Sequence, residues 1–314
     1  MIAFLFPGQG SQTVGMGRAL AEVPECRAVF DEADAALGEP LSRLCFEGPE
    51  AQLRLTENTQ PAILTVSVAA ARLLASRGLA PDYVAGHSLG EYSAHVAAGT
   101  FAFADAVRIV RRRGRYMQEA VPAGTGAMAA VLGADAAAVA RACEESAAVG
   151  FVSPANLNAP GHIVISGTRE AVAHASERVK ALGARRVVPL AVSAPFHCAL
   201  MRPAQERLEP ELRALAAADP SVPVVANVDA EPKTSAAAAI DALVAQVSAP
   251  VRWEDVVRRL ASAGVRAYVE VGPGTVLSGL VRKIDREARV TNLEAPDQLA
   301  AVAALVSGAR GAIS

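Results

Sequence analysis

Ser88 is the residue of this chain whose surroundings most clearly predict chemistry. It lies within Gly86-His-Ser-Leu-Gly90, which fits the pattern G-x-S-x-G. Residues 83–85 predict a short buried strand before it, and residues 89–98 predict a helix after it. A serine on such a strand-to-helix turn is placed as an acyl-transfer nucleophile, because the helix N-terminus favours developing negative charge. The alternative is that Ser88 only caps the helix, a common role for serine.

A nucleophilic serine needs a general base, and the chain has five histidines from which to supply one. A single histidine is more often structural than catalytic. His197 is the strongest candidate, because it follows a predicted strand and Pro195 at a strand-to-helix junction. Open α/β sheets place their sites at such junctions.

Arg113 stands out on a helix predicted over residues 105–121. Four other arginines of this helix point to one side and indicate a solvated face: Arg108, Arg111, Arg112 and Arg115. Arg113 instead falls on the apolar face, between Val110 and Met117. A charge on a buried face needs a partner. Either an internal salt bridge to Asp or Glu supplies it, or a substrate carboxylate does, which a guanidinium can grip with two hydrogen bonds.

Glycines also mark the loop Pro7-Gly-Gln-Gly-Ser-Gln12, which follows an apolar strand predicted over residues 2–6. A dinucleotide-binding G-x-G-x-x-G motif would need glycine at position 13, where the chain has Thr13. The loop could present backbone N–H groups to an anion beside the nucleophile, or it could be a simple turn.

Composition excludes several classes of function. The chain has 314 residues, 52% of them hydrophobic, and a formal net charge of −2, which gives no support for nucleic-acid or membrane-surface binding. No apolar stretch approaches the ~18 residues that cross a bilayer. The four cysteines show no metal-ligand spacing, so we expect reduced thiols, no metal, and a cytoplasmic protein.

The order of predicted elements indicates an insertion. Strands over residues 151–155 and 162–166 flank a turn at residues 156–161, and with their neighbours they give the order β-α-β-β-α-β of a ferredoxin-like unit. We therefore expect an inserted small subdomain at 123–192. Residues 1–122 and 193–314 would form the large subdomain, which includes a helix predicted over 62–77 after Pro61.

These features occur in motifs that together resemble the malonyl-CoA:acyl carrier protein transacylase family, which also includes acyltransferase domains of polyketide and fatty-acid synthases. The resemblance runs in order along nearly the whole chain. Its motifs are Phe6–Gln12, Gly86–Ser93, Arg113–Glu119, Gly124–Met128, Pro195–His197, Gln246 before Pro250–Trp253, and Glu270–Gly274.

The resemblance implies a fold, an activity and roles for residues. The fold would be an α/β-hydrolase-like large subdomain with a parallel sheet, carrying a ferredoxin-like insert. Ser88 would be the nucleophile and His197 its base, oriented by the backbone carbonyl of Gln246, since no acidic third member is evident. The backbone N–H groups of Gln9 and Leu89 would form the oxyanion hole. Arg113 would hold the malonyl carboxylate.

The same resemblance implies the partners. Malonyl would pass from coenzyme A to Ser88 and then to the phosphopantetheine thiol of acyl carrier protein, for fatty-acid synthesis, with no cofactor. Phe196 departs from the serine often found in free-standing members and resembles malonyl-selective polyketide acyltransferases, so a trans-acting polyketide enzyme is an alternative. A thioesterase and a non-catalytic carrier-binding module are the others. We expect a monomer, with carrier docking on basic residues such as Arg115.

Overall fold

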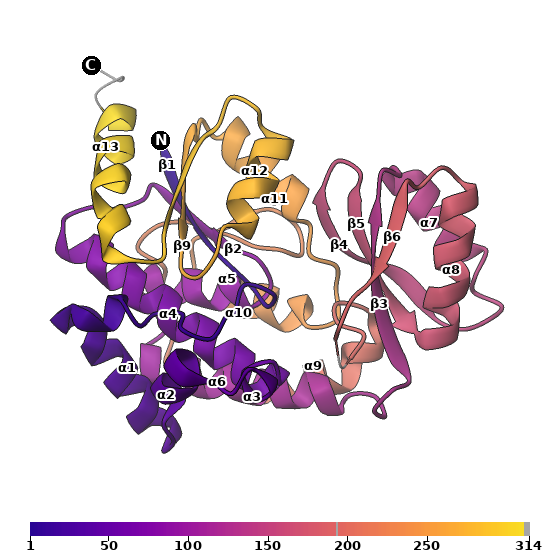
Figure 1. Ribbon diagram of the computed structural model, residues 1–314, viewed down its shortest axis with the longest axis horizontal. Coiled ribbons are helices and arrows are strands. Elements are labelled where there is room, and N and C mark those ends of the chain that lie inside the picture. Colours follow the sequence, from indigo (N-terminus) through magenta and orange to yellow (C-terminus); the bar gives the residue numbers. More distant parts are fainter. Residues whose placement is uncertain (193, 311–314) are drawn as a thin grey trace.

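A six-stranded sheet forms the centre of the larger part of the molecule (Figure 1). The computed structural model describes residues 1–192 and 194–310. Four neighbouring pairs of strands are parallel, and only the short edge pair β7 and β8 is antiparallel. In sheet order the strands are β10 (Arg289–Leu293), β9 (Ala267–Val271), β1 (Ile2–Phe6), β2 (Tyr83–Gly86), β7 (Val224–Val225) and β8 (Pro232–Lys233).

Helices cover both faces of this sheet because its central strands are apolar on both sides. All five residues of β1 are buried, which is typical of a strand inside a doubly covered parallel sheet. The helices of the large part are α1 (Pro24–Leu37), α2 (Leu41–Glu47), α3 (Glu50–Leu53), α4 (Thr56–Ser76), α5 (Leu89–Ala97), α6 (Phe103–Glu119), α9 (Arg202–Arg213), α10 (Ala236–Gln246), α11 (Trp253–Ser262), α12 (Val276–Ile284) and α13 (Leu299–Arg310). Three 3-10 turns join them: Leu20–Glu22, Ala199–Met201 and Pro296–Gln298.

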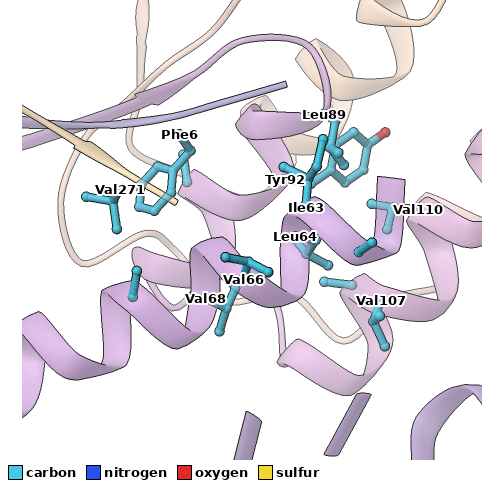
Figure 2. Close-up of a cluster of buried hydrophobic side chains, with 14 of the residues drawn as sticks. Phe6, Ile63, Leu64, Val66, Val68, Leu89, Tyr92, Val107, Val110 and Val271 are labelled. Carbon is cyan, nitrogen blue, oxygen red and sulfur yellow. The ribbon is translucent and has the colours of Figure 1, made fainter. Parts of the chain in front are cut away.

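Alternate residues of β1 enter two different cores. Phe4 and Phe6 face the core built with α1, α4, α5 and α6, whereas Ala3 and Leu5 face the core built with α11 and α12. Figure 2 shows part of the first of these cores, where Phe6 lies beside Val271 and the cluster continues through side chains of α4, α5 and α6. The packing of α4, α5 and α6 against one another fixes the elements that carry the candidate site.

A second, four-stranded antiparallel sheet lies beside the large part, on the right in Figure 1. Two helices, α7 (Ala136–Glu144) and α8 (Arg169–Ala181), pack on one of its faces. Its strands, in sheet order, are β4 (Val152–Ala159), β5 (His162–Thr168), β3 (Gly126–Leu132) and β6 (Arg186–Pro189). The chain order β3-α7-β4-β5-α8-β6 is the ferredoxin-like order expected from the sequence.

This α/β architecture, a parallel sheet with a ferredoxin-like unit inserted, confirms the predicted fold class. The elements of the second sheet and its helices span residues 126–189, inside the predicted insert of 123–192. The limits of the two subdomains, 1–122 with 193–314 and 123–192, stay predictions. Positions 193 and 311–314 lie outside the described residues.

Two predicted boundaries are wrong. Helix α4 begins at Thr56, so Pro61 lies inside the helix and does not precede it. Proline removes one backbone donor there, and the buried residues on both sides of it still hold the helix. Strand β4 runs on to Ala159 through the expected turn at 156–161, because Asn156 and Leu157 pair with β5 across two irregularities of register.

Candidate active site

Ser88 stands on the turn between β2 and α5, where the sequence predicts it. Its backbone is strained, with φ 53° and ψ −106°. Gly86 and Gly90 make the turn possible, because a Cβ on Gly86 would lie 1.9 Å from the carbonyl carbon of Gly90. Although Ser88 occupies the N-cap position of α5, its side chain makes no capping hydrogen bond. The capping alternative is therefore wrong, and the hydroxyl is free for another role.

The Ser88 hydroxyl contacts the imidazole of His197. Its Nε2 lies 2.6 Å from Ser88 Oγ, and its Nδ1 lies 3.1 Å from the backbone carbonyl oxygen of Gln246. Because a carbonyl can only accept, Nδ1 carries the proton and Nε2 accepts from the serine hydroxyl. Burial, followed by the charge of Arg113, lowers the pKa of His197 to about 3. The imidazole is thus neutral at neutral pH, and its Nε2 is available as a hydrogen-bond acceptor for the serine hydroxyl.

Backbone strain is shared by both members of this pair. His197 has φ 58°, and Ser88 and His197 are two of three non-glycine residues with positive φ in residues 1–192 and 194–310. Such strain costs about 1–3 kcal/mol per residue and gathers at functional sites. The fold therefore holds both side chains in a geometry that the local chain does not prefer.

Arg113 of α6 reaches the same place and is 1% exposed. Its Nη1 donates to Gln60 Oε1 at 2.8 Å, and its Nη2 donates to Gln246 Oε1 at 2.8 Å and to Ser88 Oγ at 3.1 Å. Burial lowers its pKa. Within the part of the chain that the structure describes, no carboxylate forms a salt bridge with Arg113. The internal salt bridge is therefore not observed, and a buried cation faces the nucleophile.

Three of the other four arginines of α6 are solvated, as the charge pattern predicts, whereas the Arg111 side chain is only 14% exposed. Each forms an ion pair with an acidic side chain, and three of the four are about half exposed. The pairs are Arg108–Asp105, Arg111–Glu39, Arg112–Glu211 and Arg115–Glu57. The contrast marks Arg113 as the one whose position needs a special explanation.

Gln9 and Leu89 line the cavity that holds Ser88, His197 and Arg113. Leu89 is the first residue of α5, so its N–H has no partner inside the helix. Ser88 N, in contrast, donates to Asn227 Oδ1 at 2.7 Å. Both residues thus lie beside Ser88 in the cavity wall, and their role as the oxyanion hole stays a prediction.

The cavity is small, about 110 Å³, and both subdomains line it. Its walls include four residues of the predicted insert: Met128, Asn156, Leu190 and Val192. Phe196, the departure noted in the sequence, is another wall residue and lies next to His197. A group bound to Ser88 would therefore be enclosed by side chains of both sheets.

Sequence reasoning missed three polar residues that organise this site. Asn227 bridges the strained turn, because its Oδ1 accepts from Ser88 N and its Nδ2 donates to Gly86 O at 2.7 Å. Gln60 and Glu91 are buried and contact the residues that surround the nucleophile. Of the three, only Asn227 has a position that could have pointed to it, because it comes just after the apolar residues of β7, at the carboxyl end of the sheet.

The described residues, 1–192 and 194–310, contain no group of three His, Cys, Asp or Glu side chains that could hold a metal ion. They also contain no helix long and apolar enough to cross a membrane.

Comparison with known proteins agrees with this geometry. A sequence profile of the acyl transferase domain matches residues 3–304. The chain is 52% identical over 301 residues to the malonyl CoA-acyl carrier protein transacylase of Escherichia coli strain K12, covering 95% of this chain and 97% of that protein. It is 50% identical over 300 residues to the protein of the same name from Bacillus subtilis strain 168, covering 95% of each.

The chain belongs to the malonyl CoA-acyl carrier protein transacylases of the acyl transferase family. Solved members share its fold. A malonyltransferase from Vibrio cholerae superposes with a TM-score of 0.94 at 44% identity, covering 96% of this chain and 99% of that one. A malonyl-transacylase in complex with its type II polyketide synthase acyl-carrier protein also has a TM-score of 0.94, at 46% identity, covering 96% and 98%. The resemblance seen in the motifs is thereby confirmed.

Proposed function

We propose that this acyl transferase moves the malonyl group from malonyl-CoA to the phosphopantetheine thiol of acyl carrier protein, through an ester on Ser88. The observation that carries the proposal is the arrangement of Arg113. A buried cation with no salt-bridge partner in the described part of the chain donates to the hydroxyl that His197 also contacts. A nucleophile for the thioester and an anchor for a carboxylate thus share one cavity.

In the first half-reaction Ser88 Oγ attacks the thioester carbonyl while its proton passes to His197 Nε2, 2.6 Å away. The tetrahedral oxyanion would take hydrogen bonds from the N–H groups of Gln9 and Leu89. Removal of one such donor typically costs about 2.7–4 kcal/mol of transition-state stabilisation. His197 then returns its proton to the sulfur of the leaving coenzyme A, and the malonyl ester remains on Ser88.

The second half-reaction runs the same steps in reverse order. His197 takes the proton of the carrier protein's thiol, the sulfur attacks the ester, and Ser88 recovers its proton. The Gln246 carbonyl keeps His197 in the required tautomer throughout, through the contact at Nδ1. No metal or redox step is required, because acyl groups only exchange between oxygen and sulfur.

Arg113 gives the selectivity for malonyl. The guanidinium donates at present to two glutamine oxygens and the serine, and its Nε has no hydrogen-bond partner among residues 1–192 and 194–310. A carboxylate that accepts from it would gain charge-assisted hydrogen bonds in a dry pocket, where these are about twice as strong as neutral ones. An acetyl group brings no such partner.

Two observations weigh on the alternatives. A thioesterase of the hydrolase type would orient His197 with Asp or Glu, and here a backbone carbonyl takes that place. A non-catalytic carrier-binding module would have no need for the contact between Ser88 and His197. A polyketide role uses the same chemistry, and the presence of Phe196 in the cavity wall does not separate the two pathways. Cytoplasmic location and a monomeric state stay predictions.

The test is the intact mass of the protein after mixing with malonyl-, methylmalonyl- or acetyl-CoA. We expect one malonyl group on the wild type and none on Ser88→Ala. Ser93→Ala is the matched control, because Ser93 is a buried serine in the middle of α5 and its loss should leave the adduct intact. Full malonylation of Ser88→Ala would place the nucleophile elsewhere and end the proposal.

A further inference from the structure

Glu91 is a buried carboxylate for which the proposed steps have no use. It lies in the first turn of α5, three residues after Ser88, and is 0% exposed. Its Oε2 accepts from Gln246 Nε2 at 2.9 Å and from Asn227 N at 3.0 Å. Its Oε1 has no hydrogen-bond partner in the described part of the chain. Acidic side chains are almost never this buried unless they are paired, so this one needs an explanation.

The side-chain amide of Gln246 lies between Glu91 and Arg113 and contacts both. Gln246 Nε2 donates to Glu91 and to the backbone oxygen of Ser88, so Gln246 Oε1 is left to face Arg113 Nη2 at 2.8 Å. The reversed amide would set its NH2 against the guanidinium and its oxygen against the carboxylate. Glu91 therefore fixes the orientation in which Gln246 serves Arg113.

The charges around Glu91 are few. Arg113 of α6 faces it and lowers its pKa, and Asp229, after β7, raises it. Asp229 is itself paired with Lys233. Tyr92, the next residue on α5, stays a neutral phenol, because burial raises its pKa to about 12. Without substrate the cluster thus holds one cation, Arg113, and one carboxylate, Glu91.

A malonyl group would add a second carboxylate to this cluster. Two carboxylates that share one buried cation resist being ionised together, and one of them then has a strongly raised pKa. The malonyl carboxylate takes the direct contact with Arg113. Glu91 stands behind Gln246 and has a bare oxygen on which a proton can reside.

We propose that Glu91 takes up a proton when a substrate carboxylate binds Arg113, so that malonyl-CoA binding is coupled to proton uptake. The inference rests on the proposed function, since it requires Arg113 to be the carboxylate site. The proton comes from solvent and bonds to Oε1, and no other covalent bond changes. Oε2 continues to accept from Gln246 and Asn227, so the amide keeps its orientation in both states.

The resting charge of Glu91 is consistent with this coupling. Burial raises its pKa to about 7, against weaker opposing effects of Gln246, Asn227 and Arg113. At neutral pH the free enzyme is then a mixture of molecules with ionised and with protonated Glu91. Binding of a second carboxylate shifts this mixture toward protonated Glu91. The uptake on binding should be about half a proton at pH 7 and close to one at pH 8.

The experiment uses Ser88→Ala, which binds malonyl-CoA without reacting, and the double variant Ser88→Ala/Glu91→Gln. Glutamine keeps the shape and accepts the same two hydrogen bonds, but it cannot ionise. Calorimetric titration with malonyl-CoA in phosphate and in Tris, at pH 7 and pH 8, gives the protons taken up. A parallel titration with coenzyme A measures the protons that its phosphates take up on binding, and this number is subtracted.

We expect proton uptake by Ser88→Ala and none by the double variant. If malonyl-CoA binds only the enzyme with protonated Glu91, Glu91→Gln also removes the free-energy cost of protonating that residue. Malonyl-CoA binding should then tighten about twofold at pH 7 and about tenfold at pH 8. Equal uptake by both variants, or no uptake by Ser88→Ala, overturns the inference.

A second measurement covers the case in which circular dichroism shows that the double variant is unfolded. For Ser88→Ala alone, the ratio of the Kd for malonyl-CoA to the Kd for coenzyme A should rise about tenfold between pH 6 and pH 8. A constant ratio overturns the inference. The proposed function fails separately, if the wild type gains no malonyl group at Ser88.

Discussion

Arg113 is a cation that the fold buries beside a nucleophile, and its contacts decide what its removal should do. Arg113→Ala removes the partner that we propose for the malonyl carboxylate. Loss of one member of a buried charged pair costs about 3–5 kcal/mol, so kcat/KM for malonyl transfer should fall roughly 10²–10⁴-fold. Acetyl transfer should fall far less. Arg113→Lys should be intermediate, because ammonium keeps the charge but not the two-pronged geometry.

This prediction is tested by measuring kcat/KM for malonyl-CoA and for acetyl-CoA together with the melting temperature of each variant. If Arg113 only holds the fold together, Arg113→Ala loses malonyl and acetyl transfer equally and melts much lower. Its hydrogen bonds to Gln60 and Gln246 make some loss of stability certain, so the ratio of the two kcat/KM values is the informative number.

His197 leads to a prediction about pH. Its pKa is lowered to about 3, chiefly by burial, so the neutral form that accepts the serine proton persists as the pH falls from 8 to 5. The rate of Ser88 malonylation at saturating malonyl-CoA should therefore show no loss with a midpoint near the ordinary histidine value of about 6.5. Rapid-quench mass measurement across this range provides the check. A midpoint near 6.5 would show that the imidazole is solvated during the reaction.

The sequence pointed more clearly to the residues to which we assign the chemistry than to the polar residues that contact them. Ser88 was visible because its turn has a local pattern, and Arg113 because it breaks the polarity of its helix. Gln60, Glu91 and Asn227 contact the site from α4, α5 and the segment after β7. No local pattern relates three such distant polar residues. Their network exists only after the sheet has brought these elements together.

At the scale of elements, the approach of α4 and α6 sets the distance between Gln60 and Arg113. Gly114 permits that approach, since a Cβ there would lie 2.6 Å from Thr56 O and 2.7 Å from Glu57 Cα. Gly114→Ala should therefore force the helices apart, at a typical overpacking cost of about 1–3 kcal/mol. Malonyl transfer should fall more than acetyl transfer, because Gln60 and Arg113 separate. Thermal unfolding and paired kcat/KM values measure both effects.

Gly279 of α12 is the matched control for that substitution. Nothing lies within 4 Å of a Cβ placed on it, so Gly279→Ala should raise stability by up to about 1 kcal/mol through helix propensity alone. A Gly114→Ala variant that is as stable as Gly279→Ala would mean that the two helices are not in close contact in solution.

The boundaries of helices and strands were predictable where the apolar periodicity was clear. They were not predictable where a single residue of low helix or strand propensity lies inside an element. Pro61 and the asparagines of β4 are residues that usually end helices or form turns. In this chain the buried flanks of α4 and the pairing of β4 with β5 outweigh those local preferences. Such long-range contacts are not visible in a short window of sequence.

On the scale of the whole molecule, the cavity opens between two sheets, and a carrier protein must reach it across the surface. Arg115 lies on α6 between Arg113 and Met117, and its side chain is 56% exposed and paired with Glu57. If the partner is acidic, as carriers of this family typically are, Arg115→Glu should raise the KM for carrier protein several-fold. Release of coenzyme A from malonyl-CoA should not change.

Arg43 of α2 offers the control for Arg115. It is also an exposed arginine paired with a glutamate, Glu47, and it is not part of the cavity wall. Arg43→Glu should alter neither half-reaction. An equal rise in the KM for carrier protein in both variants would reflect net charge alone. If neither variant changes this KM, the carrier protein does not dock on α6.

The backbone carbonyl of Gln246 that orients His197 has a consequence for genetics. Every amino acid brings a carbonyl to position 246, so no codon change can delete this acceptor. The glutamine side chain, in contrast, serves Arg113 and Glu91 and can be removed. An alanine scan would therefore reveal at position 246 only a defect in handling the substrate's charge. Under the proposed mechanism, such a scan would identify Ser88 and His197 as catalytic and would miss the carbonyl group that orients the histidine.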